Sequence, residues 1–410
     1  MGTTMRRILA AALTVLLTAG ALAVAARTFR RKDREFKYRP FFADKTEYDV
    51  LFFGTSHVVN AVFPMQLWHD WGITSYNFGD HGVTIPTSYW IMRNAVRYHK
   101  PKVAVLDVHG IAYASKIDEG HIRSMIDIFP PSLTKVLMLM DFFETADERA
   151  RFFSTYETCH NRWREMTLAE RWDSLFYSRV TREKGADSRS AVAVPDIRPR
   201  TDALFEGEMP FAHYVGTFVS FCRENGIIPV LMNIPFPASE AEQRCANSAR
   251  LVAEELGVPY DNMLGMDIVD YDTDCFDSAS HLNPSGARKV TDYIGRTLTE
   301  RYAGKGVMDR RGDPAYARWE KDYEAYCDFL VGNFYAHNNF KERLMLLNNS
   351  NFTARVFLAD GVELDRVERK LVAQLGSAVT VERVPSLPGG ARTRILLHDN
   401  ATGREHDLSL

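Results

Sequence analysis

Cysteine is scarce in this chain of 410 residues, which has only five. They are widely spaced, at Cys159, Cys222, Cys245, Cys275 and Cys327. The sequence contains neither a Cys-x-x-Cys pair nor a Cys/His cluster with metal-ligand spacing. It therefore predicts no disulfide framework and no structural zinc. We also expect no other metal site and no cofactor.

An excess of charge of one sign is also missing, since the net charge is −3 and charged residues make up 25% of the chain. Nucleic-acid binders carry a basic excess, so we expect no nucleic-acid partner. Internal repeats and low-complexity tracts are absent as well. What is present is 46% apolar residues, which suits a globular protein with a substantial core. The length fits one large domain plus a smaller one.

A long apolar run lies near the N-terminus, from Ile8 to Ala26, behind Arg6 and Arg7. At about 1.5 Å per residue it just crosses a hydrocarbon core of about 30 Å. Ala23-Val24-Ala25 also resembles a signal-peptidase site, so the run is either an uncleaved anchor or a cleaved signal. We favour a single-pass anchor in the cell membrane, with the rest of the chain outside the cytoplasm.

The charges that flank the run oppose this orientation. Seven basic residues follow it, at positions 27, 30, 31, 32, 34, 37 and 39, which is more than precede it. The positive-inside rule would keep that side in the cytoplasm, unless the basic segment lies on anionic lipid headgroups. The orientation therefore stays open at this point.

Strands alternate with helices from residue 48 onward. Short apolar runs at 48–53, 75–78, 103–108 and 228–232 predict buried strands, and residues 86–98, 211–225 and 284–302 have helical spacing. This alternation predicts an α/β fold with a parallel sheet covered on both faces. Ligands bind beyond the carboxyl ends of such strands. Residues 54–56, 79–82 and 107–109 follow three of the strands, so we expect them on one rim of the sheet.

Residues 111–200 fit the alternation poorly and predict a helical insertion over that rim. Residues 306–350 predict a helical linker. Residues 351–410 predict a small α+β domain with a strand at 352–360, a helix at 363–375 and strands at 378–384 and 391–399. We therefore divide the chain into an N-terminal anchor or signal (1–30), a main domain (31–305) that contains the insertion, the linker and the C-terminal domain.

Two segments carry candidate chemistry. The first predicted strand ends in Phe-Phe-Gly-Thr-Ser56-His57, which exposes a hydroxyl at the rim. Alone this is ordinary turn chemistry. Farther along, Asp277 lies four residues before His281, just before a helix that Asn283 would cap. A carboxylate can orient an imidazole, and the imidazole can accept a serine proton, so the three side chains can form a triad.

These segments resemble the conserved blocks of the SGNH/GDSL hydrolase family. FFGTSH is similar to the first block, which holds the serine, and FDSASHLNPSGA is similar to the last, which holds the acid and the base. NFGDHGVT is similar to the second block, whose glycine, here Gly82, donates a backbone N–H to the oxyanion. The resemblance covers about residues 48–303. It implies the family's flavodoxin-like three-layer α/β/α fold and a catalytic triad of Ser56, His281 and Asp277.

The sequence departs from the family pattern twice. The family spaces acid and base as Asp-x-x-His, whereas one more residue separates them here, so Asp274 is an alternative acid. His109 stands about where the family has an oxyanion-hole asparagine. A neutral imidazole N–H can donate to an oxyanion, so the hole would consist of the Ser56 and Gly82 N–H groups and His109. The alternative is that His109 only completes a buried turn.

Other residues are candidates for contacts with substrate. His57 follows the serine and His81 lies in the second block, while His160 and Trp163 belong to the insertion and could bind a sugar ring. A packed histidine and a core tryptophan are the alternative for the last two.

The expected function is a membrane-anchored serine esterase or O-acyltransferase. Within the family, a single N-terminal membrane segment implies action on acyl esters, mainly acetyl, of a cell-surface polysaccharide, with a membrane-bound O-acyltransferase as a candidate partner. The shifted acid and the missing asparagine support a rival, a catalytically decayed protein of the same fold that binds carbohydrate or assists an acyltransferase. A third interpretation is a lipase-like esterase that faces the cytoplasm.

Overall fold

The structure is a computed structural model that describes residues 2–30, 32, 34–112, 119–126, 129, 132–153, 160–278 and 281–409. The chain forms two compact units. The first contains residues 1–43 and 118–180, and the second contains residues 44–117 and 181–410. The central part of the expected insertion thus belongs with the N-terminal segment, while its position over the rim stays a prediction.

The first unit is helical. Its elements are α1 (Thr3–Phe29), α2 (Glu35–Ala43), α6 (Glu119–Ile126), α7 (Leu133–Phe142), α8 (Ala146–Phe153), the short turn η1 (His160–Arg164) and α10 (Leu168–Leu175). Helix α1 contains the predicted apolar run, with a mean hydropathy of 2.4 over a stretch of which 0% is buried. It is long and apolar enough to span a membrane or to serve as a signal sequence.

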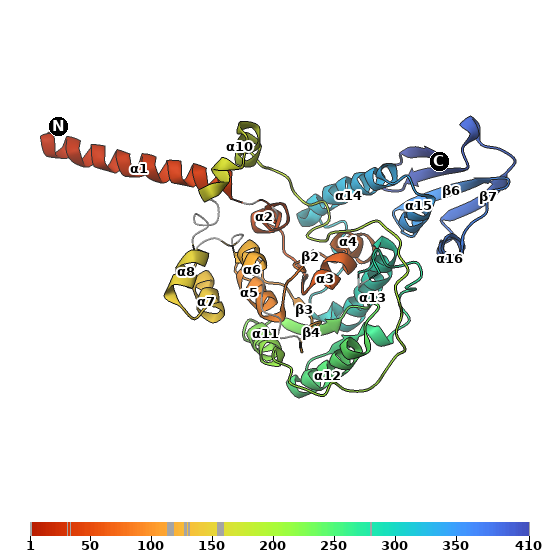
Figure 1. Ribbon diagram of the computed structural model, residues 1–410, viewed down its shortest axis with the longest axis horizontal. Helices are drawn as coiled ribbons and strands as arrows, with labels where there is room; N and C mark the ends of the chain where they lie inside the picture. The colour runs from red at the N-terminus through yellow and green to blue at the C-terminus, as the bar shows by residue number, and fades with distance from the viewer. Residues whose placement is uncertain are drawn as a thin grey trace. The chain divides into compact units, whose positions relative to one another are not determined.

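A parallel sheet forms the centre of the second unit (Figure 1). Its strands are β1 (Val50–Phe53), β2 (Ser75–Asn77), β3 (Val103–Asp107), β4 (Ile228–Asn233) and β5 (Tyr260–Asn262). They lie in the order β2-β1-β3-β4-β5, and all pairs are parallel. This is the flavodoxin-like order, so the predicted α/β fold is confirmed.

Helices cover both faces of this sheet. They are α3 (Ser56–Ala61), α4 (Pro64–Trp71), α5 (Ile85–Ala95), α11 (Ala212–Glu224), α12 (Glu240–Leu256) and α13 (Pro284–Tyr302), with the short turn η2 (Met263–Gly265). Helices α3, α4 and α13 pack together on one face, while α5 and α11 cover the other, with α12 beside α11 (Figure 1). The predicted helices at 86–98, 211–225 and 284–302 correspond to α5, α11 and α13.

The side chains of β1 point alternately to the two faces of the sheet, and both faces are covered by helices. Val50 and Phe52 belong to the apolar cluster beneath α3, α4 and α13. Phe53 points to the opposite face, where its ring lies 5.9 Å from that of Phe218 in α11. All four residues of β1 are buried, because successive side chains of a strand face opposite sides and both sides are covered here.

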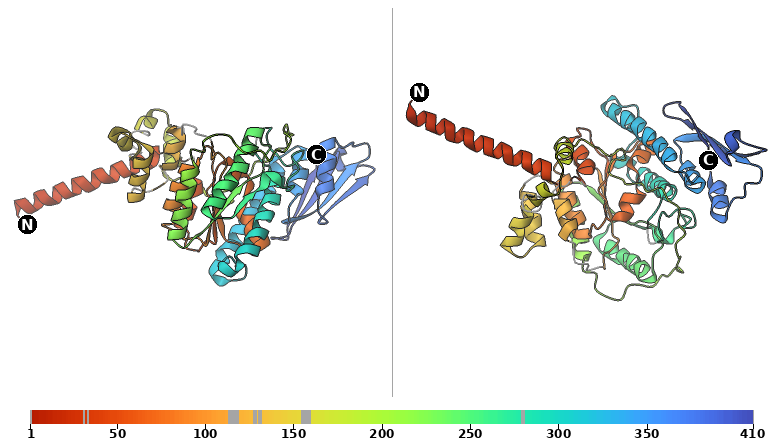
Figure 2. Two further views of the ribbon diagram at one scale, coloured as in Figure 1. Left: turned by 90° about the horizontal axis from the view of Figure 1, so that it is seen from below. Right: turned by 45° about the horizontal axis from the view of Figure 1, so that its top comes forward.

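The C-terminal part of the second unit is a four-stranded sheet with helices (Figure 2). It comprises η3 (Ala303–Lys305), η4 (Pro314–Tyr316), α14 (Ala317–Ala336), α15 (Phe340–Leu347), β6 (Phe352–Ala359), α16 (Arg366–Gln374), β7 (Val379–Val384), η5 (Pro388–Gly390), β8 (Thr393–Asp399) and β9 (Glu405–Ser409). The strand order is β7-β6-β8-β9. The predicted α+β composition is confirmed, and β9 is an additional edge strand.

Candidate active site

Ser56 lies where the carboxyl end of β1 meets the first residue of α3. Thr55 caps this helix, and its hydroxyl accepts a hydrogen bond from the His57 backbone N–H at 3.3 Å. Gly54 packs against the neighbouring strand so closely that a Cβ there would lie 2.7 Å from the Cβ of Asp107. The glycine therefore lets β1 end tightly against β3, which fixes the position of the serine at the rim.

Ser56, His281 and Asp277 form a continuous hydrogen-bonded chain. His281 Nε2 lies 2.9 Å from the Ser56 hydroxyl, and Nδ1 lies 2.6 Å from Oδ2 of Asp277. The second oxygen of Asp277 accepts the His281 backbone N–H at 3.1 Å. One carboxylate thus holds both the ring and the main chain of the histidine. This arrangement fixes the imidazole so that Nε2 faces the hydroxyl.

The segment that carries the acid and the base closes on itself. Cys275 and Leu282 form an isolated antiparallel bridge, and the Phe276 N–H donates to the His281 carbonyl at 3.1 Å. The Phe276 ring stacks on the imidazole with centroids 5.3 Å apart. Asn283 then caps α13 as predicted, accepting the N–H groups of residues 285 and 286. The bridge brings the two ends of the segment together, so the spacing with one extra residue still places Asp277 against the ring.

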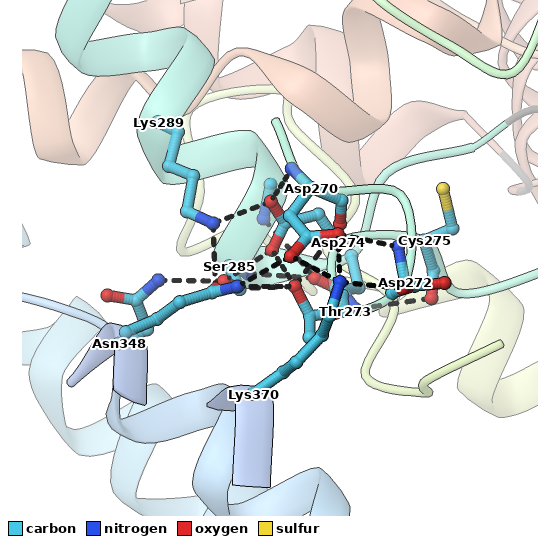
Figure 3. Close-up of polar contacts among 12 residues, drawn as sticks. Asp270, Asp272, Thr273, Asp274, Cys275, Ser285, Lys289, Asn348 and Lys370 are labelled. Carbon is cyan, nitrogen blue, oxygen red and sulfur yellow. Dashed lines mark hydrogen bonds and ion pairs between the residues drawn. The ribbon is translucent and has the colours of Figure 1, made fainter. Parts of the chain in front are cut away.

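Asp274, the alternative acid, belongs to a different network (Figure 3). It is fully buried, and its carboxylate accepts from the Lys289 ammonium at 2.6 Å, the Ser285 hydroxyl at 2.8 Å and the Asp270 N–H at 2.8 Å. Lys370 of helix α16 donates to the Asp270 carboxylate in the same loop at 3.2 Å (Figure 3). Asp277 is therefore the carboxylate that contacts His281, while Asp274 ties its loop to α13.

The second motif is tied to α3. Asn77 donates to the carbonyls of Val58 and Val62, both at 2.8 Å, and its side-chain oxygen accepts the Gly79 N–H at 2.8 Å. Gly82 follows with φ +73°, a backbone conformation that favours glycine. The loop that carries Gly82 is thus held beside the helix that begins at Ser56. The role of its N–H in an oxyanion hole stays a prediction.

Two further histidines pack next to the triad, His57 buried and His109 partly buried. The His57 ring lies 4.2 Å from that of His109, 4.2 Å from Phe236 and 5.6 Å from His281. Burial lowers the pKa of His109 to about 4. Burial, with the nearby His109 and His281, holds the pKa of His57 well below its usual 6.5. Both rings are therefore neutral at pH 7, and a neutral His109 retains the single N–H that an oxyanion donor needs.

Asp107, the last residue of β3, lies beneath this cluster and is almost completely buried. Its carboxylate accepts from the N–H groups of His109 and Ile234 and from the Thr55 hydroxyl, each at 3.4 Å. Burial raises the pKa of Asp107 to about 7, because these long hydrogen bonds offset only part of the cost of a buried charge. The ends of β1, β3 and β4 are thus joined through one carboxyl group.

The other substrate-binding candidates are placed differently. His81 lies near the triad, with its ring 6.1 Å from that of His281 and its Nε2 3.6 Å from the Asp187 carboxylate. Trp163 belongs to the first unit and is 49% exposed. The side chain of His160 lies outside the described residues, as does Cys159. The other four cysteines are buried free thiols, and the described residues contain no cluster suited to a metal ion.

Sequence reasoning missed Phe236, Phe276 and Asp187 as neighbours of the site. Phe236 follows β4, so the rule that placed the ends of β1 and β3 on one rim would also have identified the residues after β4. Phe276 directly precedes the acid and was within the recognised motif. Asp187 lies in an irregular segment, and no pattern in the sequence indicates that it approaches His81.

No known family model matches the sequence, and no curated protein matches it. Solved structures similar to the chain include the lipase/acylhydrolase from Enterococcus faecalis, at 11% identity and a TM-score of 0.33, covering 62% of this chain and 96% of that one. A GDSL-like lipase from Bacteroides thetaiotaomicron has 10% identity and a TM-score of 0.34, covering 65% and 98%. The psychrotrophic esterase EstA from Pseudoalteromonas sp. has 10% identity and a TM-score of 0.32, covering 61% and 96%.

These three structures are a lipase/acylhydrolase, a GDSL-like lipase and an esterase, and their likeness to the chain is one of fold. The three sequence motifs resemble the SGNH/GDSL family. The membrane-anchored branch of that family stays a prediction. At this level of identity, an assignment of function has to rest on the contacts of Ser56, His281 and Asp277.

Proposed function

We propose that the protein is a serine hydrolase or acyltransferase that acts on ester bonds through Ser56, His281 and Asp277. The observation that carries the proposal is the chain of hydrogen bonds of 2.9 Å and 2.6 Å that joins the hydroxyl, the imidazole and the carboxylate. A serine hydroxyl is a weak nucleophile until a base accepts its proton, and a base within hydrogen-bond reach that is oriented by an acid provides this activation.

The reaction takes two steps. Ser56 Oγ attacks the ester carbonyl while His281 Nε2 takes the hydroxyl proton, and Asp277 stabilises the resulting imidazolium. The tetrahedral intermediate collapses, the C–O bond to the leaving alcohol breaks, and His281 protonates that alcohol. Water or an acceptor hydroxyl then attacks the acyl-serine, again losing its proton to His281. The second collapse releases an acid or a new ester and returns the proton to Ser56.

The negative charge of the intermediate needs donors. We assign this role to the backbone N–H groups of Ser56 and Gly82 and to His109, which carries an N–H in its neutral state. Such preorganised donors act most strongly where water is excluded. His57 and Phe236 are buried and His109 is partly buried, which supports a dry wall on that side of the serine.

The finer substrate class is part of the proposal. We infer that the acyl group is a small one such as acetyl and that the acceptor or donor is a cell-surface glycan, with a membrane-bound O-acyltransferase as a partner. The resemblance to the SGNH/GDSL family and the apolar helix α1 support this inference. His57, His81, His160 and Trp163 remain the candidates for contacts with substrate.

A catalytically decayed carbohydrate-binding protein is the competing function. It would need no ordered bond between Ser56 and His281, and the 2.9 Å contact therefore favours the enzyme. The missing asparagine does not decide between them, because His109 can supply a donor.

Substitution of the triad tests the proposal. Ser56→Ala and His281→Ala should each abolish turnover of p-nitrophenyl acetate, and the double variant should lose little more, because triad members act as a unit. A fluorophosphonate probe should label Ser56 in the wild type alone. Thermal midpoints should barely move, since the triad lies at the rim of the sheet rather than in the core.

The companion variants Asp277→Asn and Asp274→Asn separate the two acids. Asp277→Asn should reduce turnover strongly, because it loses the carboxylate that orients the imidazole. Asp274→Asn should mainly lower the thermal midpoint. A wild-type protein that turns over neither this ester nor acetylated sugars, and that no probe labels, would leave only the binding function.

A further inference from the structure

Helix α10 is fastened to the C-terminal end of α1, the apolar N-terminal helix, within the first unit (Figure 1). The Ser174 hydroxyl donates to the Thr28 carbonyl at 2.5 Å, and Arg162 of η1 donates to the Phe29 carbonyl at 2.7 Å. In return, Arg27 donates to the Leu175 carbonyl at 2.8 Å. The last carbonyls of a helix lack partners within the helix, and here the insertion supplies them. The two helices are therefore joined where the apolar run ends.

Helix α10 presents an apolar stripe to solvent. Leu168, Trp172 and Phe176 are 80%, 66% and 58% exposed, and their spacing of four places them on one face. We call these three residues the α10 stripe. Glu170 and Asp173 lie on other sides of the helix, and a capping box of Thr167 and Glu170 holds its N-terminus. Large side chains exposed together in this way mark a surface that contacts a partner.

Trp163, the residue after Arg162 in η1, is a second exposed indole close to the C-terminal end of α1. It is 49% exposed, and its carbonyl accepts a hydrogen bond from Arg171 of α10. Tryptophan and tyrosine are enriched at the level of lipid headgroups, where an apolar ring with one polar atom fits both phases. Two exposed indoles beside the end of an apolar helix match that arrangement.

Positive charge gathers at the same helix end. Arg27, Arg30, Lys32 and Arg39 all lie within 3.9 Å of one carboxylate, that of Glu35. Four cations around one carboxylate leave an excess of positive charge. Such a segment next to a membrane helix attracts anionic headgroups, by about 1 kcal/mol per basic residue near the surface.

We propose that the α10 stripe and Trp163 dip into the headgroup region of the bilayer that α1 crosses, as a second membrane contact of the protein. The partner is a phospholipid surface, because α10 is hydrogen-bonded to the end of an apolar helix whose apolar stretch is 0% buried and because cations gather at that end. The proposal depends on retention of α1 in the membrane and is independent of the proposed chemistry at Ser56.

Quenching of tryptophan fluorescence by brominated lipid tests the contact. The full-length protein is reconstituted in vesicles of phosphatidylcholine and phosphatidylglycerol, with or without bromine on the acyl chains. Helix α1 contains no tryptophan, Trp68, Trp90 and Trp319 are buried, and Trp71 is partly buried against the core cluster, so quenching reports mainly on the exposed indoles Trp163 and Trp172. We expect clear quenching in the wild type and a loss of about half or more of it in the double variant Trp163→Phe/Trp172→Phe.

A matched control places a tryptophan on another side of α10. Asp173→Trp in the double-phenylalanine background should be quenched less than the natural Trp172.

Equal quenching of the wild type and of the double variant would overturn the proposal. It would also be overturned if the wild type is not quenched in vesicles from which alkaline carbonate cannot extract the protein. The latter result would point to a protein partner for the stripe. Cleavage of α1 in cells, detected by intact mass, would also overturn it. Turnover of p-nitrophenyl acetate should be unchanged in the single variant Trp172→Phe, which separates this contact from the function of Ser56.

Discussion

At the scale of single residues, the environment of His109 decides whether the site has a third oxyanion donor. The ring is nearly buried against His57 and Phe236, and its lowered pKa keeps it neutral. His109→Ala should lower kcat by about 10²-fold or more, as expected for loss of one donor. His109→Asn should restore part of the activity, because an amide N–H can donate from the same region.

Steady-state kinetics with p-nitrophenyl acetate measures both variants, and thermal unfolding provides the control. A change in the thermal midpoint of His109→Ala with kcat unchanged would mean that the ring only completes a buried turn.

Asp107 predicts an unusual dependence of stability on pH. The unfolded chain loses this proton near pH 3.8, whereas the folded protein holds it until about pH 7. Between these values the folded state binds more protons, so this group lowers the free energy of unfolding as pH rises. Asp107→Asn removes the effect. The free energy of unfolding of the variant minus that of the wild type should rise from pH 4 to pH 7 and level off above it.

Urea unfolding at several pH values measures this difference, in which the opposite contributions of His57 and His109 cancel. Those neutral imidazoles destabilise the fold as pH falls below 6.5, because the unfolded chain then takes up protons that the buried rings do not. A difference that stays flat between pH 4 and pH 7 would contradict the raised pKa of Asp107.

Much of the site follows from the sequence at this scale because its residues lie at strand ends. Ser56 and His109 follow predicted strands, and parallel strands bring their carboxyl ends to one edge. The choice between Asp277 and Asp274 did not follow. It depends on the bridge between Cys275 and Leu282, which is a backbone contact that residue spacing does not encode.

At the scale of elements, the sequence predicted what has a strong pattern. The strands β1, β3 and β4 are continuous apolar runs, and the limits of α13 matched because Asn283 and Pro284 mark its start. The short strand β5 and the edge strand β9 were missed. Their sequences, YDN and EHDLS, are polar, and such strands form because a neighbouring strand offers free backbone groups rather than because their side chains are buried.

The network of Figure 3 joins α13 and α16 to the loop before the acid, and it predicts a stability effect. Lys289 pairs with the fully buried Asp274 and also donates to Gln374 of α16 at 2.9 Å. Lys289→Met leaves a buried carboxylate without its cation, which should cost about 2–4 kcal/mol of unfolding free energy. Arg296→Met, at an exposed position of the same helix, is the matched control and should cost much less.

Chemical denaturation measures both variants. If Lys289→Met and Arg296→Met are equally stable, the network does not contribute to the free energy of unfolding. We also expect Lys289→Met to retain most of its turnover, because Asp277 and His281 are held by their own bridge rather than by Asp274.

At the scale of the whole molecule, a retained α1 would leave the second unit on one side of a membrane, and the flanking charges bear on which side. Helix α1 is long enough to span, but the basic residues that follow its apolar run outnumber Arg6 and Arg7, which precede that run. The positive-inside rule taken alone would keep residues 40–410 in the cytoplasm. A protein that acts on cell-surface glycans needs the opposite orientation.

We expect the extracytoplasmic orientation, and two fusions at the C-terminus measure it. Alkaline phosphatase folds only outside the cytoplasm, where its disulfides form, so that fusion should be active, whereas a green fluorescent protein fusion exported in the same way should be dark. Replacing Arg27 and Arg30 with alanine should leave this orientation unchanged, because it weakens the signal that opposes export.

A bright fluorescent fusion with an inactive phosphatase would place the triad in the cytoplasm. In that case we expect the same alanine variant to shift part of the protein population to the extracytoplasmic side. That outcome would rule out a cell-surface glycan as substrate while leaving the chemistry of Ser56 intact, so the two fusions separate the location of the enzyme from its reaction.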